Sequence, residues 1–188
     1  MKKFILICLL SLAALIPQAH AQQFSVRTNA LGWAALGTMN LGAELALAPR
    51  WTVTADVLWN PWVYGNGKQT KMWGIQPEVR FWCCRKFTGH FVGLHTMYAD
   101  YDFGLDKYRY NGWLSGLGVS YGYSWAFSDH WRLEGNIGLG WLHKDYDREG
   151  RAQRTGDVRI YSSQRKDGFG ITRAGISISY LIFNKKKR

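Results

Sequence analysis

The sequence predicts an all-β protein: an eight-stranded antiparallel up-and-down transmembrane β-barrel that follows a cleaved signal peptide. Three observations predict this fold. An apolar leader opens the chain, eight segments alternate apolar and polar residues, and the connections between these segments alternate between short turns and longer loops. Strands with one apolar and one polar face, joined in this way, are typical of small outer-membrane barrels.

The leader, residues 1–21, is expected to be a secretory signal peptide. Lys2 and Lys3 precede the apolar run "FILICLLSLAALI", and Ala19 and Ala21 form an Ala-x-Ala cleavage site. The alternative is a membrane anchor, but the run is too short to span a bilayer comfortably. We therefore expect residues 22–188 to form one exported domain that ends in a basic tail.

The eight predicted strands lie near residues 24–35, 39–48, 51–62, 72–84, 90–101, 112–127, 131–143 and 169–183. In the third, apolar residues recur at every second position from Trp51 to Trp59. The fourth, sixth, seventh and eighth alternate in the same way, whereas the fifth is the least regular. A period of two residues indicates strands with two different faces.

The connections divide into two sets. "PR", "RKFTG" and "SDH" join the predicted strands on one side, and "YGNGKQTK", "DYDFGLDKYRYN" and a long segment at 144–168 join them on the other. The remaining connection on this second side, near "LGTM", is short. This asymmetry favours an up-and-down barrel with its long loops at the outer end.

A soluble lipocalin-like binding barrel would show the same alternation with its apolar face inward, so the orientation needs separate evidence. The predicted strands contain no lysine, and Gly, Ser, Thr and Asn dominate their polar face, which suits a narrow interior. Trp131 and Trp141 lie ten residues apart, or roughly 25 Å along the membrane normal for a tilted strand. We therefore predict that the apolar face contacts lipid.

This orientation places a balanced set of charges in the lumen. They are Arg27, Glu44, Asp56, Glu78, Arg80, Arg132, Glu134 and Arg173. Charges in a narrow interior must be paired to offset their desolvation, so we expect a hydrogen-bonded plug. The alternative function is a path for protons or ions.

Several short motifs resemble an uncharacterised exported family of Bacteroidota, the domain of unknown function 3575. They are "NALGW" at 29–33, "NLGAEL" at 40–45, "QPEVRFW" at 76–82, "GYSW" at 122–125 and "WRLE" at 131–134. The resemblance covers most of the exported chain. It implies an outer-membrane barrel from gut-type bacteria, and it implies no activity and no catalytic residues. The chain departs from ordinary barrels because Phe183 is followed by "NKKKR", so an aromatic signal for the barrel-assembly machinery would be internal.

Other residue types give weak chemical signals, and no catalytic, cofactor or metal site is predicted. Cys83 and Cys84 are adjacent in a predicted strand, so they are expected to face opposite sides and to be packing residues. His90, His95, His130 and His143 lack metal-ligand spacing. The net charge of +11 would suit nucleic acid, but export makes that partner unsuitable.

The segment 144–168 is a candidate for contacts with anions. Its basic residues include Arg148, Arg151, Arg154, Arg159, Arg165 and Lys166. A hairpin here would bring Arg148 and Arg151 opposite Arg165 and Lys166, where lipopolysaccharide phosphates or the segment's own aspartates would separate the like charges. The alternatives are a surface protein partner or a solvated connection.

Two classes of function follow from the sequence. The first is a non-enzymatic outer-membrane barrel with a plugged lumen that serves envelope structure, surface binding or adhesion. The second is a membrane-embedded lipid-modifying enzyme, of the lipid A deacylase or acyltransferase type. Ser162, Ser163, His143 and Asp145 supply the residue types that such an enzyme needs.

Overall fold

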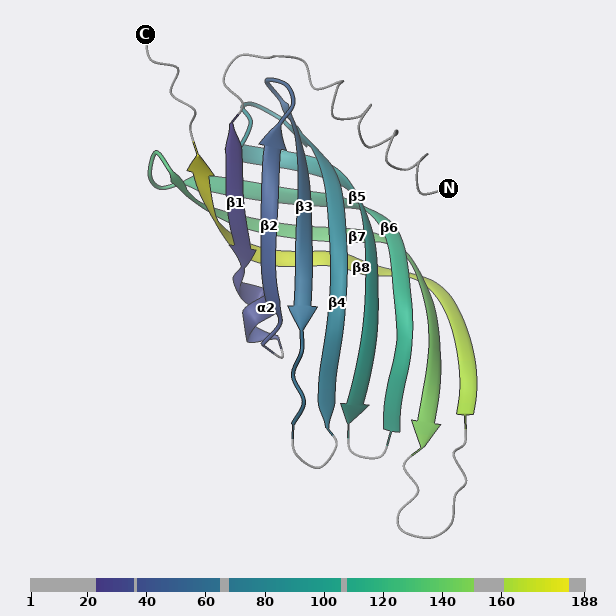
Figure 1. Cartoon of the computed structure of the whole chain (residues 1–188). Coiled ribbons are helices and arrows are strands. Elements are labelled where there is room, and N and C mark those ends of the chain that lie inside the picture. Colours follow the sequence, from purple (N-terminus) through teal and green to yellow (C-terminus); the bar gives the residue numbers. More distant parts are fainter. Residues whose placement is uncertain (1–22, 36, 65–67, 106–107, 151–160, 183–188) are drawn as a thin grey trace, which may run out of the picture.

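The computed structural model describes residues 23–35, 37–64, 68–105, 108–150 and 161–182. Its elements are β1 (Phe24–Asn29), α2 (Ala30–Ala34), β2 (Met39–Ala46), β3 (Trp51–Asn60), β4 (Gln69–Trp82), β5 (Gly89–Leu105), β6 (Tyr108–Ala126), β7 (Trp131–Gly150) and β8 (Tyr161–Ile182). Each strand pairs antiparallel with the next, and β1 pairs with β8, so one sheet closes into a ring (Figure 1). The predicted eight-stranded antiparallel β fold is confirmed. The predicted signal peptide and the basic tail lie outside the described residues.

The first predicted strand, 24–35, is too long, because β1 ends at Asn29 and the single-turn helix α2 follows. The side-chain oxygen of Asn29 accepts a hydrogen bond from the backbone N–H of Leu31 at 3.0 Å and caps this turn. In the part of the chain that the structure describes, no helix is long and apolar enough to cross a membrane.

The later strands are longer than predicted. β5 and β6 run through most of "DYDFGLDKYRYN", and β7 and β8 run far into the segment 144–168. Lys71, Lys144 and Lys166 therefore lie in strands, which corrects the expectation that strands contain no lysine. Their polar sequences suggest loops, yet the backbone ladder continues through them because cross-strand hydrogen bonds do not depend on side-chain polarity.

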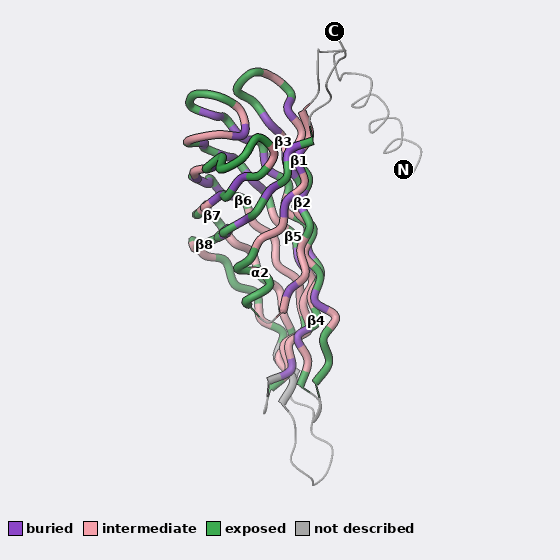
Figure 2. Tube along the Cα trace, turned by 90° about the vertical axis from the view of Figure 1, so that its left-hand side faces the viewer, coloured by how far each residue is buried: buried purple, intermediate pink, exposed green. Residues whose placement is uncertain are grey.

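Strand length rises along the chain, from six residues in β1 to 22 in β8. As a result, β4–β8 continue past the ends of β1–β3, and they form an open layer below the ring in Figures 1 and 2. We call this layer the sheet extension; it comprises residues 69–72, 101–105, 108–112, 146–150 and 161–164.

The two faces of the ring have opposite polarity. Exposed apolar side chains cover the outside, among them Leu41, Val57, Ile75, Val79, Leu94, Leu117, Val119, Ile137, Leu139, Ile176 and Ile178. Buried polar side chains line the inside, among them Arg27, Glu44, Thr52, Thr54, Glu78, Arg80, Ser120, Glu134 and Ser177. The apolar-inward arrangement that a soluble lipocalin-like barrel requires is therefore wrong for this chain.

A β-bulge in β8 adds a polar side chain to the interior. Gly138 on β7 lies opposite Arg173, whereas the next residue, Leu139, lies opposite Ile171. Thr172 is thus the extra residue, and both Thr172 and Arg173 are buried. The bulge shifts the alternation by one residue, so apolar side chains stay outside on both sides of it.

Glycines allow close contact between β6 and β7 inside the ring. A Cβ atom at Gly140 would collide with the carbonyl oxygen of Leu117 and the Cα atom of Gly118. At Gly135, on the outer face of the same strand, the nearest atom would be in the Trp125 ring at 3.8 Å. Only the inner position is closed to a side chain.

We predict that Gly140→Ala lowers the free energy of unfolding by about 1–3 kcal/mol, because a backbone atom cannot move aside as a side chain can. Gly135→Ala is the matched control and is expected to be neutral or slightly stabilising. The measurement is urea unfolding in detergent micelles, which the apolar exterior calls for. Equal effects at the two positions would show that the interior at Gly140 can relax.

Candidate functional site

A network of buried charges fills the middle of the ring, and Arg80 lies at its centre. The Arg80 guanidinium is fully buried and donates two hydrogen bonds to the carboxylate of Glu134, at 2.9 and 3.0 Å. It also donates to Glu78 at 2.6 Å and to Glu44 at 3.3 Å. Glu78 and Arg80 share the inner face of β4 because they are two residues apart. One side chain thus connects three carboxylates from three strands.

Two further arginines complete the network. Arg27 on β1 donates to both oxygens of Asp56, at 2.8 and 2.6 Å, and to Glu134 at 3.3 Å. Arg173 on β8 donates to Asp56 and, at 3.0 Å, to the side-chain oxygen of Gln76. Three arginines therefore bridge four carboxylates across the lumen, and bidentate geometry of this kind gives the strongest ion pairs.

Two buried aromatic side chains pack beside the network. The ring centroids of Trp82 and Phe91 lie 4.8 Å apart, and both side chains are buried. The Arg80 guanidinium lies 4.3 Å above the Phe91 ring, and the Trp82 indole N–H donates to Thr52 at 2.9 Å. A cavity of about 30 Å³ remains between Arg27 and Arg173, enough for one or two water molecules. Charged and aromatic side chains therefore pack closely in this part of the interior.

The structure brings together seven of the eight predicted lumen charges. The eighth, Arg132, is buried on the inner face of β7, but its Nε and Nη1 atoms have no hydrogen-bond partner among the described residues. His95 belongs to the interior and was missed. It is 1% exposed, and its Nε2 atom lies 2.8 Å from the Thr172 hydroxyl. Its strand alternates poorly in sequence, and the bulge that supplies Thr172 has no sequence signal.

The three predicted anion contacts that the structure describes, Arg148, Arg165 and Lys166, do not form one cluster. Arg148 lies opposite Ser162, and Lys166 lies opposite Lys144, so the predicted facing of Arg148 with Arg165 and Lys166 is wrong. Arg165 instead pairs with Asp145 on the outer face at 3.3 Å. Arg151, Arg154 and Arg159 lie outside the described residues. The error lies in the strand register, because the partner of Arg148 is Ser162, three residues before Arg165 in β8.

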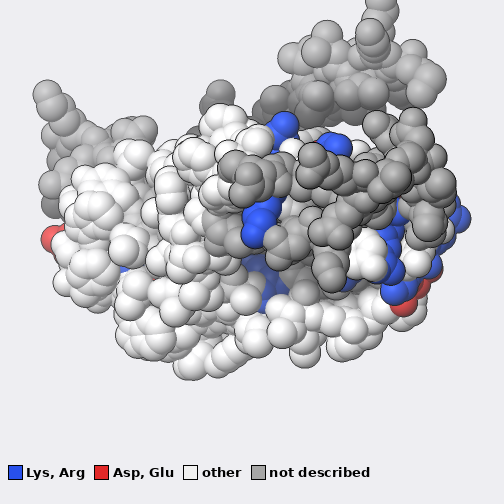
Figure 3. Space-filling view, turned by 90° about the horizontal axis from the view of Figure 1, so that it is seen from below, with Lys and Arg blue, Asp and Glu red and all other residues white. Residues whose placement is uncertain are grey.

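The inner face of the sheet extension is rich in aromatic side chains, and Arg148 and Lys166 lie against it. The Arg148 guanidinium is 3.9 Å from the centroid of the Tyr108 ring, and the Lys166 ammonium is 5.9 Å from that of Tyr146. Seen from this end, the Lys and Arg side chains of the described residues lie in more than one group (Figure 3). Among the described residues, a phosphate would therefore meet Arg148 and Lys166 as separate cations.

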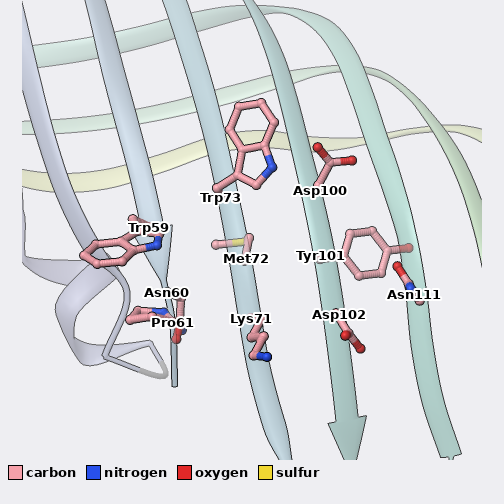
Figure 4. Close-up of a pocket in the computed structure, with 10 residues that line it drawn as sticks. All are labelled: Trp59, Asn60, Pro61, Lys71, Met72, Trp73, Asp100, Tyr101, Asp102 and Asn111. Carbon is pink, nitrogen blue, oxygen red and sulfur yellow. The ribbon is translucent and has the colours of Figure 1, made fainter. Parts of the chain in front are cut away.

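The exposed apolar side chains on the outside of the ring form a band. A row of cross-strand residues marks the edge of this apolar band that adjoins the sheet extension. It crosses five strand pairings as Trp59, Trp73, Asp100, Trp113, Asp145 and Arg165. A hollow of about 320 Å³ opens along it, lined by residues of β3–β6 that include Trp59, Trp73, Lys71, Asp100 and Asp102 (Figure 4). Strand-end tryptophans were predicted, but the hollow was missed because Asp100 and Asp102 seemed to begin a loop.

Asp102 lies two residues beyond Asp100 on the same face of β5, in the sheet extension. The Arg109 guanidinium donates to it at 2.7 Å through Nε. These hydrogen bonds from Arg109 lower the pKa of the Asp102 carboxyl below its usual value, so it stays ionised at neutral pH. Asp102 is thus already paired.

The cysteines and histidines form no metal site among the described residues. Cys83 and Cys84 are both exposed and free, so the prediction that they are packing residues in a strand is wrong; β4 ends before them, at Trp82. Among the described residues, no group of three or more His, Cys, Asp or Glu could hold a metal ion. His143 lies 2.5 Å from Asp167, and Ser163 is four residues from Asp167, about 13 Å along β8.

Comparison with known proteins identifies a family. A family model described as "Protein of unknown function (DUF3575)" matches residues 4–182 and confirms the resemblance seen in the motifs. No curated protein and no solved structure matches the chain.

We predict that Glu134→Leu lowers the free energy of unfolding by about 3–5 kcal/mol, because Arg27 and Arg80 lose a buried partner. Asp145→Asn breaks the exposed pair with Arg165 and is the control; it is expected to cost less than about 1 kcal/mol. Glu134→Gln, which keeps the shape of the side chain but removes its charge, is the second variant to use if the leucine variant fails to fold. Denaturant unfolding measures all three, and similar costs for Glu134 and Asp145 variants would contradict a stabilising network.

Proposed function

The chain belongs to the DUF3575 family, whose description gives no activity, and we therefore propose a function from the structure. The protein is a small, non-enzymatic β-barrel of the bacterial outer membrane, exported by a cleaved signal peptide. Its lumen is plugged, and its sheet extension serves binding at the cell surface.

The observation that carries this proposal is the reversed polarity of the ring. Exposed valine, leucine and isoleucine side chains surround it on β2–β8, whereas soluble monomers rarely expose apolar patches larger than a few hundred Å². Exposed Trp131 and Trp141 lie near the two ends of this band, and interfacial tryptophans are typical of membrane proteins. A lipid surround removes the cost of exposing this surface to water.

The packed interior supports a binding or structural role over transport. Arg80 and Glu78 are essentially inaccessible, and the small cavity beside them has room for only one or two waters. A pore would need continuous water along the lumen. Every charge in the network is instead paired, either with a residue of another strand or, as for Arg80 and Glu78, with one of the same strand.

The sheet extension supports a role at the surface. It continues β4–β8 beyond the row that runs from Trp59 to Arg165. Its inner face includes Tyr101, Phe103 and Tyr110. The centroids of Tyr101 and Phe103 lie 5.3 Å apart, so this face offers rigid aromatic area. We propose lipopolysaccharide or a surface protein as its partner, and the barrel-assembly machinery as the partner during insertion.

Lipid hydrolysis is a second candidate function, favoured by one alignment. Ser115, His143 and Asp167 lie in one cross-strand row on the outer face, and His143 Nδ1 is 2.5 Å from Asp167. A Ser–His–Asp row has the residue types of an acyl-transfer site. No hydrogen bond joins Ser115 to His143 within the described residues, which ranks this function second.

We expect the folded protein to leave the masses of purified envelope lipids unchanged over a long incubation, as measured by mass spectrometry. A Ser115→Ala variant is the control for contaminating hydrolases. Loss of an acyl chain with the wild type but not with Ser115→Ala would establish the enzymatic function instead.

For the outer-membrane location, we predict that the mature protein fractionates with the outer membrane and migrates differently on gels with and without boiling. The shift is expected because a closed sheet resists detergent until it is heated. Recovery as a free periplasmic protein would contradict the proposal.

A pair of lysine variants on β6 tests which surface contacts lipid. Val119 is 55% exposed and lies midway between Trp113 and Trp125, so Val119→Lys is expected to cost about 2–4 kcal/mol in a bilayer. Asn111→Lys, on the same face beyond the aromatic row, is expected to cost less than about 1 kcal/mol.

A further inference from the structure

We infer that Asp100, together with the tryptophans on either side of it, binds the primary ammonium of a phosphoethanolamine lipid headgroup. This inference rests on the proposed membrane location. It assigns a ligand to the hollow at the outer edge of the apolar band, which is separate from the lumen network.

The strand register builds an aromatic enclosure around the Asp100 carboxylate. Asp100 on β5 lies directly opposite Trp73 on β4 and Trp113 on β6. Tyr98, one repeat closer to the band, packs against both tryptophans, with centroids 5.7 and 6.1 Å away. Its hydroxyl donates to Asp100 at 3.1 Å and so orients the carboxylate.

This enclosure suits a cation. Aromatic faces attract ammonium groups, and a carboxylate accepts hydrogen bonds from an ammonium N–H. The neighbouring Asp102 is held by Arg109, and Asp145 is held by Arg165. No lysine or arginine forms an ion pair with Asp100 within the described residues, so its charge is available to a ligand.

The rest of the hollow suits a phosphate and an apolar chain. Lys71 is exposed and lies one repeat beyond the row, opposite Asp102, where it would meet a phosphate joined to the amine by two carbons. Trp59 and Trp73, both about half exposed, form the wall nearest the band (Figure 4). On the ring side of these tryptophans, exposed Val57 and Ile75 continue into the band. Polar groups therefore lie outward and apolar groups lie inward, as in a membrane lipid.

A volume of about 320 Å³ fits a headgroup, since small-molecule sites begin near 300 Å³. A primary ammonium is preferred to a quaternary one, because only the former donates hydrogen bonds to Asp100. A headgroup with phosphate and no amine would use Lys71 alone. The expected order of retention is therefore phosphatidylethanolamine, then phosphatidylcholine, then phosphatidylglycerol.

The experiment places the full mature protein in nanodiscs of equal parts of these three lipids and counts the lipids retained after release into detergent, by native mass spectrometry. We expect phosphatidylethanolamine to exceed phosphatidylglycerol about five- to tenfold. Asp100→Asn should remove this preference, and Asp145→Asn, in the same row but already paired with Arg165, should leave it unchanged. Trp113→Leu is a second variant that should weaken it several-fold.

The inference is overturned if Asp100→Asn keeps the preference, or if Asp145→Asn removes it equally. Displacement of the lipid by free phosphoethanolamine at comparable concentration would overturn the lipid as ligand and assign the site to a soluble amine. Gel shift and incorporation into nanodiscs are measured on each variant. A wild type that incorporates but shows no preference contradicts this inference alone, whereas one that does not incorporate contradicts the proposed function.

Discussion

The contact of Arg80 with Glu134 is the interaction on which the rest of the interior depends. It joins β4 to β7 across the lumen, and both groups are almost wholly inaccessible. Charges removed from water are stable only when each has well-placed partners. This requirement explains the glycines that face the lumen: a side chain at Gly42 would collide with Asp56, and one at Gly93 would collide with Glu78. Glycine thus occupies the positions where a Cβ atom would take the space of the network's carboxylates.

The network also determines strand register. Because side chains alternate between faces, a slip of one residue would move every charge of a strand to the apolar exterior. The single side chain of Arg27 contacts carboxylates on β3 and on β7. Only one register of β1 against its neighbouring strands allows both contacts. The outside of the ring is chemically uniform and gives little specificity. Specificity therefore resides inside, where each guanidinium has a defined set of acceptors.

Alternation was enough to predict the eight strands and which charges point inward, because both follow from the two-residue period that any strand obeys. The partners of those charges could not be predicted, since the contact of Arg80 with Glu134 depends on how strands stagger around the ring. The bulge at Thr172 and the sheet extension were missed for related reasons. A bulge is a local defect in register, and polar strands such as those around Asp102 and Asp147 resemble loops once they leave an apolar environment. Asp100 was missed as a candidate binding residue because its aromatic surroundings come from Trp73 and Trp113, which lie on other strands.

The rising strand length has a kinetic consequence. Each pairing from β1–β2 to β7–β8 joins strands that are neighbours in sequence, and such local contacts form quickly. The seam between β1 and β8 has only six residue pairs, and it joins opposite ends of the chain, with Phe24 facing Ile182. Closing it is therefore the slow, nonlocal step of folding. Arg27 and Arg173 sit on the two strands of that seam and meet at the same Asp56. Closing the seam therefore also completes the lumen network, because it brings these two arginines to the same carboxylate.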